Sequence, residues 1–129
     1  MDEGPLVEEQ IEAAARFLAR FDKYAPVRVA FWLKEAESPF WYFCIVSDEI
    51  TGANFDLAYR EVGRLARELR DPAFNVMRVK VFGIDTPMGQ AAMNAQRPYP
   101  SKSPVVLRNR YFGGVEAAEI YIYPQPVTV

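Results

Sequence analysis

The chain has 129 residues, of which 50% are hydrophobic and 25% are charged, values typical of one globular domain. A chain of this length can bury a core without disulfides or metal ions. It contains no histidine, which excludes histidine-dependent catalytic triads, a histidine general base and histidine metal ligands. Its single cysteine excludes an internal disulfide. We therefore expect one compact domain over residues 1–129, with an extended C-terminal tail at residues 124–129.

The formal net charge of −2 is divided unevenly along the chain. Residues 1–59 carry a balance of −6 and residues 60–129 a balance of +4, which is a reason to look for a basic face. The acidic N-terminus lacks the profile of a signal peptide, and the longest apolar run, residues 40–46, is too short to span a bilayer. We expect a cytoplasmic protein with no membrane partner.

The first half of the chain predicts a helix and then two strands. Apolar side chains recur at steps of three and four over residues 6–23, which indicates an amphipathic helix. Residues 27–34 alternate in polarity, and residues 40–47 are apolar on both sides. The short link between these two segments favours an antiparallel hairpin. The second strand is expected to be central, because both of its faces are apolar.

The second half predicts two helices and three strands. Residues 54–70 form a helix with an apolar stripe, and residues 76–84 form a strand of alternating side chains. A short Ala-rich helix follows over residues 86–96, and residues 105–112 and 119–123 are the last strands. The order α-β-β-α-β-α-β-β predicts the α+β class, a mixed five-stranded sheet with three helices mainly on one face. No dinucleotide or phosphate-binding glycine motif is found, so no cofactor is predicted.

The sheet face away from the helices is the sharpest candidate site. Each strand sends alternate residues to this face, where aromatic rings would mix with arginine and lysine. The second strand adds one of two largely apolar sets, either Trp41, Phe43 and Ile45 or Phe40, Tyr42 and Cys44. The predicted partner-binding or ligand-binding residues are Arg28, Trp32, Lys34, Trp41, Arg78, Lys80, Phe82, Arg108 and Arg110, and Tyr121 and Tyr123 share one side of the last strand.

Three interpretations of this face remain open. A large exposed apolar patch indicates a partner, so the first is a non-catalytic interaction or regulatory module that self-associates, for example as a homodimer, or binds another protein. The second is a nucleic-acid or anionic-ligand binder that stacks bases on the rings and holds phosphates with the cations. The third is ordinary cover of the face by other segments of the chain.

A weaker pattern concerns carboxylates at strand ends. Asp48 and Asp85 each follow a strand and precede a helix, the end at which parallel α/β units bind ligands. If their strands are adjacent and parallel, the two side chains could share a Mg²⁺ ion or act as acid and base in a small phosphoesterase or transferase. Helix capping is the alternative role, and no metal site is assigned.

Two further features have structural explanations. Cys44 lies within an apolar run and is expected to be a buried structural thiol. Arg60, Arg64 and Arg67 fall on the outer side of the 54–70 helix, where ion pairs with acidic residues four positions away are expected.

Overall fold

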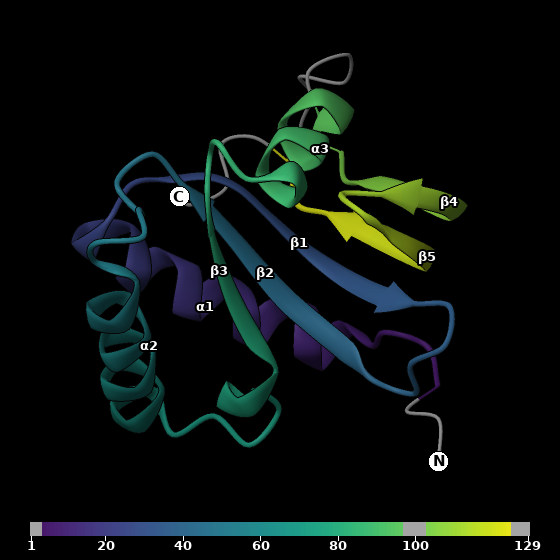
Figure 1. Cartoon of the computed structure of the whole chain (residues 1–129). Helices are drawn as coiled ribbons and strands as arrows, with labels where there is room; N and C mark the ends of the chain where they lie inside the picture. The colour runs from purple at the N-terminus through teal and green to yellow at the C-terminus, as the bar shows by residue number, and fades with distance from the viewer. Residues whose placement is uncertain (1–3, 97–102, 125–129) are drawn as a thin grey trace.

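The computed structural model describes residues 4–96 and 103–124, which form a five-stranded sheet with helices on both faces (Figure 1). The predicted element order and the α+β class are confirmed. The helices are α1 (Glu8–Tyr24), α2 (Phe55–Leu69) and α3 (Pro87–Gln96), with a short 3-10 turn η1 (Val76–Arg78), and the strands are β1 (Val27–Glu35), β2 (Trp41–Ser47), β3 (Val79–Gly83), β4 (Val105–Phe112) and β5 (Val115–Ile122).

The sheet is mixed and has the strand order β3-β2-β1-β5-β4. β2 and β3 run parallel, because helix α2 carries the chain back between them, and the other neighbouring pairs are antiparallel. β3 and β4 are therefore the two edges, and α3 connects them. Among the described residues, none of the helices is both long enough and apolar enough to cross a membrane.

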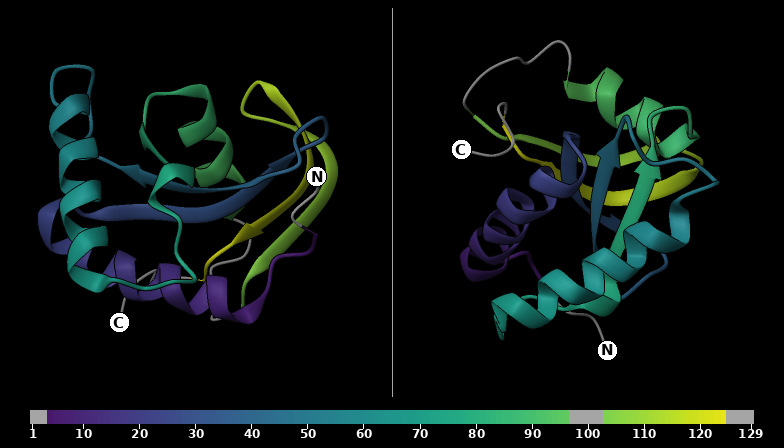
Figure 2. Two further views of the ribbon diagram at one scale, coloured as in Figure 1. Left: turned by 90° about the horizontal axis from the view of Figure 1, so that it is seen from below. Right: turned by 90° about the vertical axis from the view of Figure 1, so that its left-hand side faces the viewer.

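Helices α1 and α2 cover one face of the sheet, which we call the first face. Phe17 and Phe21 of α1 and Val62 of α2 pack there against Trp32 of β1 and Phe43 of β2. The turned view shows α1 below the sheet and α3 above it (Figure 2). Trp32 and Phe43 are cross-strand partners, so their rings reach the same side of the sheet.

Helix α3 lies on the opposite, second face. Met88 and Ala92 of α3 pack with Phe31 of β1, Phe112 of β4 and Ile122 of β5 in a separate buried cluster. The residues of β1 alternate between the two clusters, with Ala30 and Trp32 in the first and Val29, Phe31 and Leu33 in the second. Both sides of β1 and β2 are largely apolar, because helices pack against each face of the sheet.

Two element boundaries differ from the prediction. The last strand begins at Val115 rather than at residue 119. The strand predicted over residues 76–84 is shorter, because Val76–Arg78 form the 3-10 turn η1 and β3 spans Val79–Gly83. The pairing of β1 with β5 also shifts by one residue between Lys34 and Glu35. Gly113 and Gly114 form the turn before β5 with φ of +58° and +96°, conformations that glycine adopts without strain. The predicted tail beyond Pro124 and residues 97–102 lie outside the described residues.

Candidate functional site

The two tryptophans do not lie on an open sheet face. Trp32 and Trp41 are 3% and 2% exposed and belong to the first face, beneath α1 and α2. The prediction that Trp32 lies on the face away from these helices was wrong, and of the two alternatives left open for β2 the set Trp41, Phe43 and Ile45 is the one beneath them. Alternation separates the two sides of a strand, but it does not say which side the helices cover when both sides are apolar.

The indole of Trp32 is held by a buried hydrogen-bond relay. Its Nε1 donates to the Tyr123 hydroxyl at 3.1 Å, and that hydroxyl donates to the Ile11 carbonyl of α1 at 2.7 Å. Burial raises the pKa of Tyr123 well above its usual range. Trp41 Nε1 donates to the Gly4 carbonyl at 2.8 Å. Both indole N–H groups are thus satisfied inside one chain, as buried donors require.

Among the described residues, Arg28, Asp48 and Asp85 do not form a recognisable catalytic or metal site. Ser47 of β2 pairs with Gly83 of the parallel strand β3, so Asp48 and Asp85 follow neighbouring strand ends, as the metal hypothesis required. Asp48 is engaged by Arg28, whose Nη1 lies 3.0 Å from both of its carboxylate oxygens. No group of three or more histidine, cysteine, aspartate or glutamate side chains suited to a metal ion occurs among the described residues.

Arg108 and Arg110 lie on the exposed edge strand β4. The guanidinium of Arg108 is 3.6 Å from Glu119 of β5. Asn109 between them has a φ of +51°, which departs from extended geometry. Charged side chains and local irregularity on an edge strand oppose unwanted strand pairing between molecules. This role accounts for the two arginines without a ligand.

The opposite edge is protected by a side chain from α2. The Tyr59 hydroxyl accepts a hydrogen bond from the Val81 backbone N–H of β3 at 2.9 Å. Burial raises the pKa of Tyr59, so the hydroxyl keeps its proton at neutral pH. One outward-facing amide of the edge is thereby unavailable to an added strand. The sequence carried no signal for this contact, because Tyr59 reads as an ordinary residue of an amphipathic helix.

Part of the second face remains uncovered by α3. Arg78, Lys80 and Phe82 project there beside Phe40 and Tyr42, and we call these five residues the basic–aromatic patch. The Arg78 guanidinium lies 3.4 Å from the centre of the Phe40 ring, and the Lys80 ammonium lies 4.2 Å from that of Tyr42. All five side chains are partly exposed. Lys80 and Phe82 share one side of β3 as predicted, Arg78 joins them from the preceding turn η1, and β2 presents the Tyr42 side rather than the Trp41 side.

Cys44 lies beneath this patch and is fully buried. Burial raises the pKa of its thiol far above the usual range. A thiol that is both inaccessible and protonated is a poor nucleophile. The expectation of a buried thiol is confirmed.

A groove adjoins the patch where α3 begins. It has a volume of about 340 Å³. We call it the α3 groove, and its lining residues are Leu33, Glu35, Lys80, Phe82, Thr86, Pro87, Met88, Gly113 and Val115. The sequence identified Lys80 and Phe82 of this set. The others were missed because they come from β1, α3 and the β4–β5 turn, which only the folded chain brings together.

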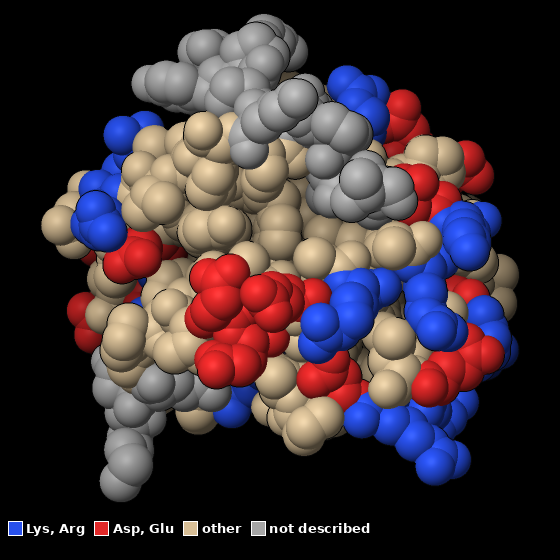
Figure 3. Space-filling view, turned by 180° about the vertical axis from the view of Figure 1, so that it is seen from behind, with Lys and Arg blue, Asp and Glu red and all other residues tan. Residues whose placement is uncertain are grey.

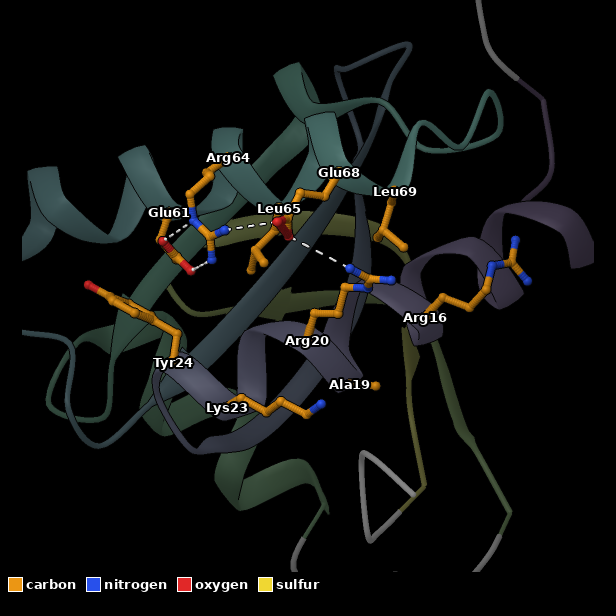
Figure 4. Close-up of a pocket in the computed structure, with 10 residues that line it drawn as sticks. All are labelled: Arg16, Ala19, Arg20, Lys23, Tyr24, Glu61, Arg64, Leu65, Glu68 and Leu69. Atoms are coloured by element: carbon orange, nitrogen blue, oxygen red, sulfur yellow. Dashed lines mark hydrogen bonds and ion pairs between the residues drawn. The ribbon is translucent and has the colours of Figure 1, made fainter.

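A second, larger groove lies between α1 and α2, and most of its charged side chains form ion pairs (Figure 4). Arg64 binds Glu61 and Glu68, Glu68 also lies 3.7 Å from Arg20, and Arg16 pairs with Asp71. The expected pair of Arg64 with Glu68, four residues later, is confirmed. Asp71, four residues after Arg67, instead pairs with Arg16 of α1. Seen from this side, acidic side chains gather near the middle of the face and many basic ones lie to their right (Figure 3).

The two grooves therefore differ in kind. In the groove between the helices, Arg16, Arg20 and Arg64 already have carboxylate partners. The α3 groove is smaller and more apolar, and it adjoins the unpaired cations of the basic–aromatic patch. Comparison with models of known protein families, with curated protein sequences and with solved structures returns no match for this chain.

Proposed function

We propose that this protein is a non-catalytic interaction module that binds an acidic segment of a partner protein on the basic–aromatic patch. The observation that carries the proposal is the state of two cations. Arg78 and Lys80 form no ion pair with any described residue and lie over aromatic rings instead. Arg16, Arg20, Arg28, Arg64 and Arg108 have carboxylate partners. Arg60 and Arg67 on the exposed side of α2 also have no ion pair with a described residue, but only Arg78 and Lys80 lie over the aromatic rings of described residues.

The composition of the patch is that of an interface centre. Arginine, tyrosine and phenylalanine are enriched at protein interfaces, and tyrosine and arginine dominate binding hot spots. The rings of Phe40 and Tyr42 hold the two cations close to the sheet surface, which reduces the side-chain entropy lost on binding. A carboxylate that approaches Arg78 or Lys80 would meet an oriented, uncompensated donor.

An acidic protein segment suits this patch better than the two alternatives. Two copies meeting through this patch about a two-fold axis would bring Arg78 and Lys80 of both chains together, and like charges oppose that contact. A nucleic acid would need free ring faces for base stacking, but the cations already lie over Phe40 and Tyr42.

The test is an NMR titration with a ten-residue glutamate-rich peptide that contains one leucine. We expect saturable shifts confined to β3 and the start of β2, with an affinity that falls as salt rises. The double variant Arg78→Gln/Lys80→Gln should bind at least about tenfold more weakly. The matched control, Arg60→Gln/Arg67→Gln on the exposed side of α2, removes the same charge and should change affinity less than about twofold.

Three results would overturn the proposal. Equal losses in both double variants would mean that only overall charge matters. Tight binding of oligothymidine that depends on Arg78 and Lys80 would assign the patch to nucleic acid. A dimer in light scattering that dissociates in the Arg78→Gln/Lys80→Gln variant would assign it to a second copy of the chain. Heteronuclear correlation spectra of each variant would verify that the fold is retained.

A further inference from the structure

The α3 groove has the size and lining of a small-molecule site. Its volume of about 340 Å³ falls within the range of ligand pockets, which are mainly apolar with a few placed polar groups. Leu33 of β1, Phe82 of β3, and Pro87 and Met88 of α3 line the groove. Val115 of β5 also lines it.

Close backbone packing holds the walls of the groove in place. A Cβ atom on Gly113 would lie 2.7 Å from the Cα of Met88, so the β4–β5 turn rests directly on the first turn of α3. A Cβ atom on Gly89 would lie 2.3 Å from the carbonyl oxygen of Gly83. The Thr86 hydroxyl bridges these segments, since it donates to the Gly83 carbonyl at 2.8 Å and accepts from the Gly89 N–H at 3.0 Å. The groove is therefore preformed, which lowers the entropic cost of binding.

Two charged side chains of opposite sign line this apolar groove. Glu35 comes from the end of β1 and Lys80 from β3, which are separated by β2. Neither forms an ion pair with a described residue, and in particular they do not pair with each other. Both nevertheless act on the buried Cys44 thiol between them, in opposite directions. The groove thus offers one uncompensated anion and one uncompensated cation around an apolar chamber.

We infer that the α3 groove binds a small zwitterion with an apolar body, of the chemistry shared by apolar amino acids and short apolar peptides. Lys80 holds the carboxylate and Glu35 holds the ammonium, while Leu33, Phe82 and Met88 surround the apolar part. β2 lies between the strands that carry Glu35 and Lys80, so each charge is free to meet one end of the ligand. The groove shares Lys80 and Phe82 with the basic–aromatic patch, but the inference does not require the proposed protein partner, because Arg78 and Phe40 do not line the groove.

The experiment measures the methyl resonances of Leu33, Met88 and Val115 in the full chain during titration with four probes. These are leucine, leucyl-leucine, N-acetyl-leucine, which lacks the ammonium, and leucinamide, which lacks the carboxylate. We expect leucine or leucyl-leucine to give saturable shifts, and the stronger of the two identifies the source of the zwitterion. Loss of either charge from the probe should weaken binding about tenfold.

Variants assign each end of the ligand to its residue. Glu35→Gln should abolish the preference for leucine over N-acetyl-leucine, and Lys80→Gln should abolish the preference for leucine over leucinamide. The matched control Glu37→Gln, an exposed neighbour outside the groove, should retain both preferences. No saturable methyl shift at millimolar probe, or unchanged preferences in both variants, would overturn the inference.

The same variants separate this inference from the proposed function. Arg78→Gln should weaken the acidic peptide and leave the leucine probes unaffected, whereas Glu35→Gln should do the reverse. Loss of peptide binding alone would therefore leave the groove assignment intact. Loss of probe discrimination alone would leave the acidic-partner proposal intact.

Discussion

The two faces of the sheet differ in how completely the chain covers them. On the first face, α1 has 17 residues and α2 has 15, lengths of about 26 Å and 23 Å at 1.5 Å per residue. On the second face, α3 has 10 residues and spans only about 15 Å. The nine-residue strand β1 is about 30 Å long. One short helix cannot cover that length, so the second face keeps an open end, and the patch and groove lie there.

The comparison predicts different losses of stability for two neighbouring residues of β2. Phe43 is fully buried on the first face, whereas Tyr42 is partly exposed on the second. Phe43→Ala should destabilise the protein by about 3–5 kcal/mol, because it opens a cavity that α1 cannot fill. Tyr42→Ala should cost about 1 kcal/mol. Chemical denaturation measures both, and equal losses would mean that the two faces are equally closed.

The wall of the α3 groove can be tested with two adjacent glycines. Both have positive φ, but a Cβ atom on Gly113 would clash with Met88, whereas one on Gly114 would meet nothing within 4 Å. Gly114→Ala therefore pays only backbone strain of about 1–2 kcal/mol. Gly113→Ala should cost about 1–2 kcal/mol more, because the turn must move away from α3. Similar denaturation midpoints for the two variants would show that the turn does not rest tightly on α3.

The hydrogen-bond relay of Trp32, Tyr123 and Ile11 should contribute more to stability than the hydroxyl of Tyr121, which lies two residues earlier in β5. Tyr123→Phe removes the hydroxyl that accepts from Trp32 Nε1 and donates to the Ile11 carbonyl, and should cost about 1–3 kcal/mol. Tyr121→Phe is the matched control, because its hydroxyl makes no hydrogen bond within the described residues, and should cost less than about 0.5 kcal/mol. A red shift of tryptophan fluorescence in Tyr123→Phe alone would report the exposed indole, and its absence would count against the relay.

The smallest effect concerns the paired ions at the rim of α1 and α2. The hydrogen bond from Arg16 lowers the pKa of Asp71. The stabilisation from the pair of Arg16 with Asp71 is therefore present above the usual carboxyl pKa. It is lost as pH falls through the lowered pKa of Asp71 in the folded protein. Between about pH 5 and pH 2, the melting temperature of the wild type should fall more than that of Arg16→Gln. Arg60→Gln should follow the wild type, and parallel curves for all three proteins would contradict the pairing.

Much of the fold followed from local patterns. The strand limits at residues 27–35, 41–47 and 105–112 and the three helices agree with periodicity to within a few residues. The parallel pairing of β2 with β3 follows from the helix that joins them. Part of the candidate site could also be predicted, because alternation along residues 76–84 places Arg78, Lys80 and Phe82 on one side.

The remainder of the site depended on contacts between distant segments. Glu35 reads as the polar end of a strand, and Gly113 reads as an ordinary turn. Neither position signals that β1, β3, α3 and the β4–β5 turn meet around one groove. Trp32 was misplaced for the same reason, since its side of β1 was interpreted as an open basic–aromatic face, and the side of β2 that carries Trp41 was left undecided.

The sequence by itself determined which side chains share a face of each strand, because a period of two is a property of the extended backbone. It also determined that β2 is central and that Cys44 is buried, because an apolar run has no polar side to expose. Only the tertiary structure decided which face lies under α1 and α2. That choice depends on contacts such as the one between Trp32 and Tyr123, which are 91 residues apart in the chain, and on a third helix too short to close the other face.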